Sequence, residues 1–201
     1  MLKPALLALG LALGLAGCAT TWETTYQQLD AAQTAGWRVA AVEVAVPDAL
    51  TTSEANNYIP DFDIVWHGEP AGDRRVQVAA ILREGIEKGA AGLNGKTGVR
   101  IVATVSQFHA ITPVVRERLQ NSGVHNIRYT VQVFDARSGA ALSQPQLIKA
   151  EFPALVGKAG DEAEARGLTQ RVQIVNQIAA VTQNWLGRGA DPRGSFQRRG
   201  R

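Results

Sequence analysis

The sequence predicts an α+β fold in which a mostly antiparallel sheet of four to five strands carries two main helices packed on one face. Three observations lead to this prediction. Two segments alternate apolar and polar residues as half-buried strands do, and two longer segments repeat apolar residues with the period of an amphipathic helix. The predicted elements follow the order strand, strand, helix, strand, strand, strand, helix, and a chain of 201 residues suits one core.

Residues 1–17 have the layout of a secretory signal peptide. Lys3 precedes an uncharged apolar run that ends short of the roughly 20 residues a membrane-spanning helix needs. The Leu-Ala-Gly-Cys motif that ends at Cys18 resembles the lipobox of bacterial lipoproteins, which implies that Cys18 becomes the acylated first residue of the mature chain. Ala19 resembles the pattern that sorts lipoproteins to the outer membrane. The alternative is a soluble secreted protein whose Cys18 only lies near a cleavage site.

Residues 18–36 predict a tether or a short helix, because their few large apolar residues recur at helical spacing in a stretch rich in Thr and Gln. Residues 37–187 are then expected to form a single α+β domain. Its first strand is predicted by the β-branched run 37–46, and a second, shorter strand by the apolar run 62–67.

Residues 73–93 and 168–186 predict the two main helices, because each places apolar residues on one face and charged or amide residues on the other. Gly85 and Gly89 lie four residues apart in the first of them. Glycine inside a helix is unfavourable by about 1 kcal/mol relative to alanine. We therefore expect the pair to allow a close approach of this helix to the sheet.

Residues 99–106 and 127–133 predict half-buried strands by their alternation. The turn sequence 135–139 ends in a glycine and leads into a further strand over 142–152, so a β-hairpin is expected. Pro145 in the returning strand favours an edge position, because proline has no backbone N–H to donate.

The tail 188–201 is rich in Arg and is expected to be disordered, because it has almost nothing to bury. It would meet anionic lipid headgroups or remain solvated. The rest of the mature chain carries slightly more acidic than basic residues, although the formal net charge is +3. Nucleic-acid binding needs clustered cations on the fold itself, so no nucleic-acid partner is expected.

Four stretches of the predicted domain resemble an uncharacterised family of bacterial lipoproteins. They are Thr52–Pro60, Asp63–Trp66 followed by Gly72–Arg75, Phe108–Ala110 and Asp135–Gly139. The hairpin is also loosely similar to envelope accessory lipoproteins with a small α/β domain like the N-terminal domain of TolB. Neither resemblance supplies a catalytic residue.

His109 and His125 are weak candidates for a metal site. Each lies at one end of the segment that joins two predicted strands, and the imidazoles would face each other if those strands pair. A metal site needs a third or fourth ligand, and His67 is the only other histidine in the sequence. Strand-end histidines that bond to the backbone are therefore the favoured interpretation.

The connection 110–123 is longer than most hairpin loops, and long ordered loops are often functional. It is predicted to contact a partner protein, and a short helix packed on its own domain is the alternative. The contact candidates are Val114, Val115, Arg116, Arg118 and Leu119.

The sequence contains no P-loop, dinucleotide-binding or Gly-x-Ser-x-Gly motif. We therefore expect a membrane-anchored, non-enzymatic accessory lipoprotein of the bacterial envelope, without a cofactor, that docks on an assembly or transport partner. One alternative is a carrier that holds a small apolar or amphipathic ligand between helix and sheet, in a cavity of a few hundred Å³. The other is a metal-binding protein that uses its histidines.

Overall fold

The computed structural model describes residues 20–120 and 122–198, which form eight strands and five helices. The strands are β1 (Thr20–Thr25), β2 (Trp37–Ala45), β3 (Thr52–Ser53), β4 (Ile64–Val65), β5 (Thr97–His109), β6 (Val124–Asp135), β7 (Gln146–Pro153) and β8 (Gly194–Arg198). The helices are α1 (Ala31–Thr34), α2 (Arg74–Ala90), α3 (Pro113–Arg118), α4 (Gly157–Ala165) and α5 (Gln170–Trp185).

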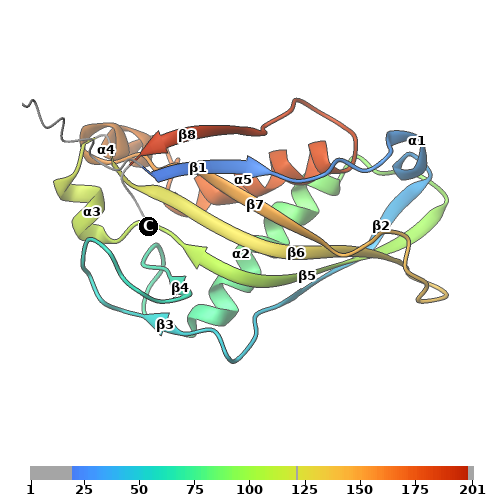
Figure 1. The fold of residues 1–201 in the computed structure, drawn as a ribbon, viewed down its shortest axis with the longest axis horizontal. Coiled ribbons are helices and arrows are strands. Elements are labelled where there is room, and N and C mark those ends of the chain that lie inside the picture. The colour runs from blue at the N-terminus through green and yellow to red at the C-terminus, as the bar shows by residue number, and fades with distance from the viewer. Residues whose placement is uncertain (1–19, 121, 199–201) are drawn as a thin grey trace, which may run out of the picture.

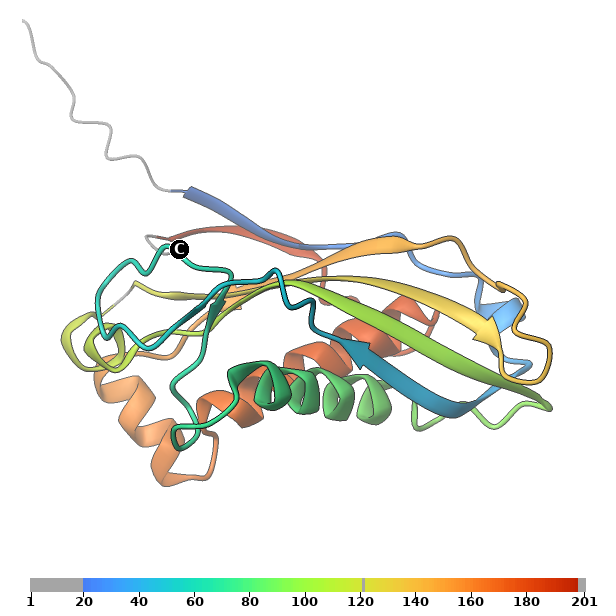
Figure 2. The same cartoon turned by 90° about the horizontal axis from the view of Figure 1, so that it is seen from below.

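All eight strands belong to one sheet with the order β3-β4-β5-β6-β7-β1-β8, and β2 also pairs with β5. The pairs from β5 through β6, β7 and β1 to β8 are antiparallel, and the pairs that involve β2, β3 and β4 are parallel. Helices α2 and α5 lie side by side on one face of the sheet (Figures 1 and 2). The α+β class and the two main helices are confirmed, but the predicted four to five strands are too few.

Three strands form where the sequence predicts none: the two-residue β3, and two strands outside the predicted domain, β1 and β8. β1 occupies part of the expected tether, and β8 occupies part of the tail expected to be disordered. The two strands pair with each other, with Trp22 opposite Phe196, and the Trp22 indole N–H donates to the Arg198 carbonyl at 3.0 Å. Each strand therefore depends on a partner about 175 residues away, which no local pattern reveals. The tether and tail predictions are wrong for these residues.

β7 is not an edge strand, which corrects the prediction based on Pro145. β1 pairs beside it through Thr24 opposite Ala150, and Pro145 lies just before the strand begins. The proline therefore does not interrupt any pairing of β7. Helix α4 also forms, over residues for which the sequence predicts neither a helix nor a strand.

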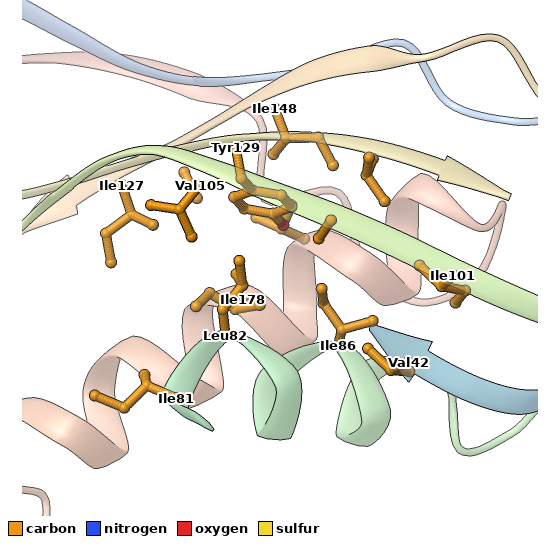
Figure 3. Close-up of a cluster of buried hydrophobic side chains, with 14 of the residues drawn as sticks. Val42, Ile81, Leu82, Ile86, Ile101, Val105, Ile127, Tyr129, Ile148 and Ile178 are labelled. Atoms are coloured by element: carbon orange, nitrogen blue, oxygen red, sulfur yellow. The ribbon is translucent and has the colours of Figure 1, made fainter. Parts of the chain in front are cut away.

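The core lies between the sheet and the two main helices (Figure 3). From Ile127 to Val133 of β6, every second residue is buried, which is the period-2 pattern of a half-buried strand. The residues that meet there include Ile127 and Tyr129 of β6, Leu82 and Ile86 of α2, and Ile178 of α5. Their close fit fixes the sheet and both helices as one body.

Gly85 and Gly89 allow α2 to approach α5 rather than the sheet. A Cβ at Gly85 would lie 2.6 Å from the Cβ of Ile178, and one at Gly89 would lie 2.4 Å from the carbonyl oxygen of Ala179. Both distances are below 3.0 Å, which is closer than a Cβ comes to a non-bonded heavy atom. The expected helix-to-sheet contact is therefore wrong, and the two glycines set the spacing of the helix pair.

Candidate functional site

An uncharged pocket of about 220 Å³ lies at the end of the sheet that carries α3, and we call it the end pocket. One side is the rim Tyr58–Pro60 from the loop between β3 and β4. The other side comes from the connection between β5 and β6 and includes Ala110, Ile111, Thr112, Val115, Leu119, Ser122, Gly123 and Val124. None of these residues carries a charged side chain, so the end pocket offers apolar surface and uncharged polar groups.

Hydrogen bonds from the β5–β6 connection hold the rim in place. The Thr112 hydroxyl donates to the Asn57 carbonyl at 2.8 Å, and the Val114 N–H donates to the Asn56 side-chain oxygen at 2.8 Å. On the far side of the rim, the His109 imidazole Nε2 is hydrogen-bonded to the Phe62 carbonyl. The loop is therefore fixed at both ends of its apolar stretch.

An ion pair between buried Arg74 and exposed Glu54 fixes the start of the same loop to helix α2. Arg74 is only 6% exposed, and its guanidinium donates to both carboxylate oxygens of Glu54, at 2.6 and 2.8 Å. It also donates to the carbonyls of Glu69 and Pro70. The hydrogen bond from Arg74 lowers the pKa of Glu54, so the carboxylate stays charged at neutral pH. Two of the stretches behind the family resemblance, Thr52–Pro60 and Gly72–Arg75, thus meet in space.

The loop presents apolar side chains outward. Tyr58 is 53% exposed, Ile59 is 61% exposed and Phe62 is 41% exposed. These are three of the six large apolar side chains that are exposed in residues 20–120 and 122–198. Single exposed apolar residues are ordinary, but a group beside an apolar pocket marks an interaction surface.

The five predicted partner-contact residues lie on or just after α3, which packs against its own domain. Val115 is buried in a small cluster with Ile111, Ala154 and Val156, and Val114 and Leu119 pack on that cluster. Arg116 forms ion pairs with Asp161, at 3.0 Å, and with Glu164, both from α4. Arg118 is the exposed member of the five. The segment is thus the short packed helix that was the alternative interpretation.

His109 and His125 do not face each other. In the register of β5 with β6, His109 is opposite Asn126, so its neighbour His125 points to the other face of the sheet. His125 is fully buried and packs against the ring of Phe152, with 4.8 Å between the ring centroids. Neither of its ring nitrogens is bonded within the described chain. Burial lowers its pKa to about 3. The described residues contain no group of three or more His, Cys, Asp or Glu that could hold a metal ion, so the metal hypothesis gains no support.

The first described residue of β1 lies at the same end of the molecule as the end pocket. Thr20 is opposite Arg198, whose guanidinium donates to the carbonyls of Ala154 at 2.8 Å and Gly123 at 3.4 Å. Gly123 lines the pocket. Figure 2 shows the start of β1 and the end of β8 at the same end of the molecule as the β3–β4 loop.

The predicted signal peptide and Cys18 lie outside the described residues. Cys18 is two residues before Thr20, so at most about 7 Å of extended chain separates their Cα atoms. Among residues 20–120 and 122–198, no helix combines the length and the apolar composition needed to cross a bilayer.

Residues 37–201 match the model of a family described as a family of unknown function, DUF6778. This confirms the expectation of an uncharacterised family, whereas the lipobox lies outside the matched residues. No curated protein is similar to this chain in sequence.

Several solved structures are similar to this chain at low sequence identity. The PelC dodecamer from Paraburkholderia phytofirmans is 13% identical, with 82% of this chain and 96% of that chain covered and a TM-score of 0.35. A candidate lipoprotein from Caulobacter crescentus is 11% identical, with 78% and 92% covered and a TM-score of 0.36. Protein XCC0632 from Xanthomonas campestris, of family DUF330, is 10% identical, with 74% and 83% covered and a TM-score of 0.45. All three TM-scores are low, so these similarities carry no inference about function.

Proposed function

Because this chain belongs to DUF6778, a family of unknown function, we propose its function from its N-terminal motif and its geometry. It is a lipid-anchored, non-enzymatic accessory protein of the bacterial envelope that docks on an assembly or transport partner. The observation that supports this proposal best is the start of the sheet at Thr20, two residues after Cys18. A domain joined so closely to an acylated cysteine works at the membrane surface and not at the end of a long stalk.

The acyl chains on Cys18 would by themselves hold the protein at the membrane. A diacylglycerol group on the Cys18 sulfur and an acyl chain on its nitrogen would bury several tails, each methylene contributing about 0.8 kcal/mol. Anchoring with two or more chains is stable, whereas a single chain binds reversibly. Ala19 after the cysteine supports an outer-membrane location that faces the periplasm.

Substitution of the anchor cysteine tests this proposal. When cells are grown with labelled palmitate, the wild-type protein is expected to take up label and Cys18→Ser is expected to take up essentially none. Thr20→Ser is the matched control, because it changes a neighbouring exposed residue and leaves the motif intact. A wild-type chain that carries no label would refute the lipid anchor.

We further propose the edge of the sheet at β8 as the docking surface for the partner. β1 is the strand that pairs with β8 in the described chain, so the other side of β8 is open to strand addition. Gly194, Ser195 and Gln197 are exposed there and are small or polar. The alternative surface on α3 is less suitable, because Val115 and Arg116 are already engaged within the domain.

Photo-crosslinking in intact cells tests this docking surface. A crosslinking residue at Gln197 is expected to give one adduct of defined mass, because a partner strand would lie within reach of the β8 side chains. The same residue at Ala136, in an exposed turn at the other end of the sheet, is the control and should give none. Docking at β8 is refuted when both positions behave alike.

The carrier alternative receives no support from the interior. The residues between the helices and the sheet, among them Ile81, Leu82, Tyr129 and Ile178, are fully buried in one cluster. The end pocket lies outside this cluster, and its volume of about 220 Å³ is below the roughly 300–1,000 Å³ of typical ligand sites.

A further inference from the structure

We propose that the end pocket and its rim rest on the lipid bilayer that holds the anchor, with Tyr58 and Ile59 inserted at the headgroup level. This inference rests on the proposed acylation of Cys18. It adds a second, non-covalent membrane contact and thereby an orientation: the end of the sheet with α3 faces the bilayer, and the turn between β6 and β7 points away from it (Figure 1).

The position of Thr20, the first described residue, supports a lipid bilayer as the surface that covers the end pocket. Thr20 lies beside Arg198, and Arg198 is bonded to Gly123 in the wall of the end pocket. Only about 7 Å of chain is available between the Cα atoms of Thr20 and Cys18. The acyl chains of Cys18 must enter the bilayer, so the end pocket is brought to the membrane surface with them.

The chemistry of the rim suits the membrane interface. Tyr58 and Ile59 are each more than half exposed, and none of the residues that line the pocket behind them is charged. Tyrosine is enriched at the headgroup level, where its ring is partly buried and its hydroxyl is hydrated. Aliphatic side chains beside it add apolar area that the bilayer can cover.

The charges at this end are mixed and do not drive the contact. Arg118 is exposed and Arg198 is partly exposed, and both would favour anionic headgroups. Asp61 and Glu117 are also exposed at this end and would oppose them. The apolar rim, and not the net charge, is therefore the part of the surface that recognises the bilayer.

The rim is held in the exposed conformation before it meets a membrane. The backbone on either side of the rim, at Asn57 and Phe62, is bonded to Thr112 and His109. Glu54 at the start of the loop is bonded to buried Arg74. A contact surface that is already ordered loses little conformational entropy on binding. The loop can thus insert without refolding.

The test uses the single cysteine of the sequence. Acylation consumes the Cys18 thiol, so Ile59→Cys adds the only free thiol of the mature chain, and an exposed side chain can be replaced without disturbing the core. The lipidated protein is labelled there with a fluorophore and reconstituted into vesicles of phosphatidylethanolamine and phosphatidylglycerol that contain a spin-labelled lipid. Ala136→Cys, labelled in the same way, is the matched control, and Tyr58→Cys is the second test position.

Spin-labelled lipid is expected to quench the probe at residue 59 or 58 at least about twofold more strongly than the probe at 136, and aqueous iodide is expected to show the reverse order. Equal quenching at all three positions by either quencher would overturn the membrane contact. When palmitate labelling shows an acylated chain and the rim probes still behave like the control, this inference fails and the proposed function stands. A chain without acyl groups overturns both.

Discussion

Replacing Gly89 with alanine is expected to lower the free energy of unfolding by about 2–3 kcal/mol, although alanine is the better helix former. The added Cβ would lie 2.4 Å from the Ala179 carbonyl oxygen and 2.7 Å from the Cβ of Thr182. The first of these atoms belongs to the backbone of α5, so α5 must move away from α2. The overpacking therefore outweighs the gain of about 1 kcal/mol in helix propensity.

Urea unfolding of the two proteins measures this difference. Gly194→Ala is the control, because a Cβ at Gly194 meets no atom within 4 Å and its effect should stay within about 0.5 kcal/mol. A stabilised Gly89→Ala protein would mean that α2 and α5 are further apart than the structure shows. Since both helices pack on the sheet, the same result would also weaken the description of the core.

Lowering the pH from 7.5 to 4.5 is expected to remove about 2–3 kcal/mol of stability through His125 alone. Burial lowers the pKa of His125 from 6.5 to about 3 in the folded protein. The unfolded chain therefore binds a proton near pH 6.5 that the folded protein does not. The stability that this residue contributes is complete above pH 6.5 and is lost as the pH falls toward 3.

Urea unfolding of the wild type and of the variant His125→Phe, each at both pH values, isolates the contribution of His125. Phenylalanine keeps a ring against Phe152 and removes two ring nitrogens that have no partner in the described chain. The variant should lose about 2–3 kcal/mol less than the wild type between the two pH values. Part of the acid sensitivity will remain, because burial also lowers the pKa of His67. Equal losses in both proteins would show that His125 is hydrated or charged in the fold.

The central strands and the two main helices could be predicted from sequence, because their burial has a local period. Ile127, Tyr129 and Val131 alternate with polar neighbours, and this alternation is the burial pattern of β6. β1 and β8 have no such independent signal. Trp22 and Phe196 lie opposite each other in neighbouring strands, and each strand is ordered by pairing with the distant other. The sequence also could not show that Gly85 and Gly89 set the spacing of the helix pair, because the residues they approach belong to the distant helix α5.

The candidate site could be predicted only in part. The length of the connection 110–123 marks it as a candidate from sequence, and it does form one wall of the end pocket. The opposite wall, Tyr58–Pro60, reaches it through bonds such as that from Thr112 to Asn57, which join residues 55 positions apart. Side-chain to backbone contacts over such a distance leave no spacing pattern. The Asn56-Asn57 pair was the available signal, and by itself it predicts only a loop.

The intact mass of the N-terminal fragment of the protein, extracted from membranes, tests the central claim most directly. We predict that the mature chain begins at Cys18, with a diacylglyceryl group on its sulfur and an acyl chain on its nitrogen. An N-terminal fragment with an unmodified Cys18 thiol would contradict the anchor, and with it the orientation of the end pocket toward the bilayer.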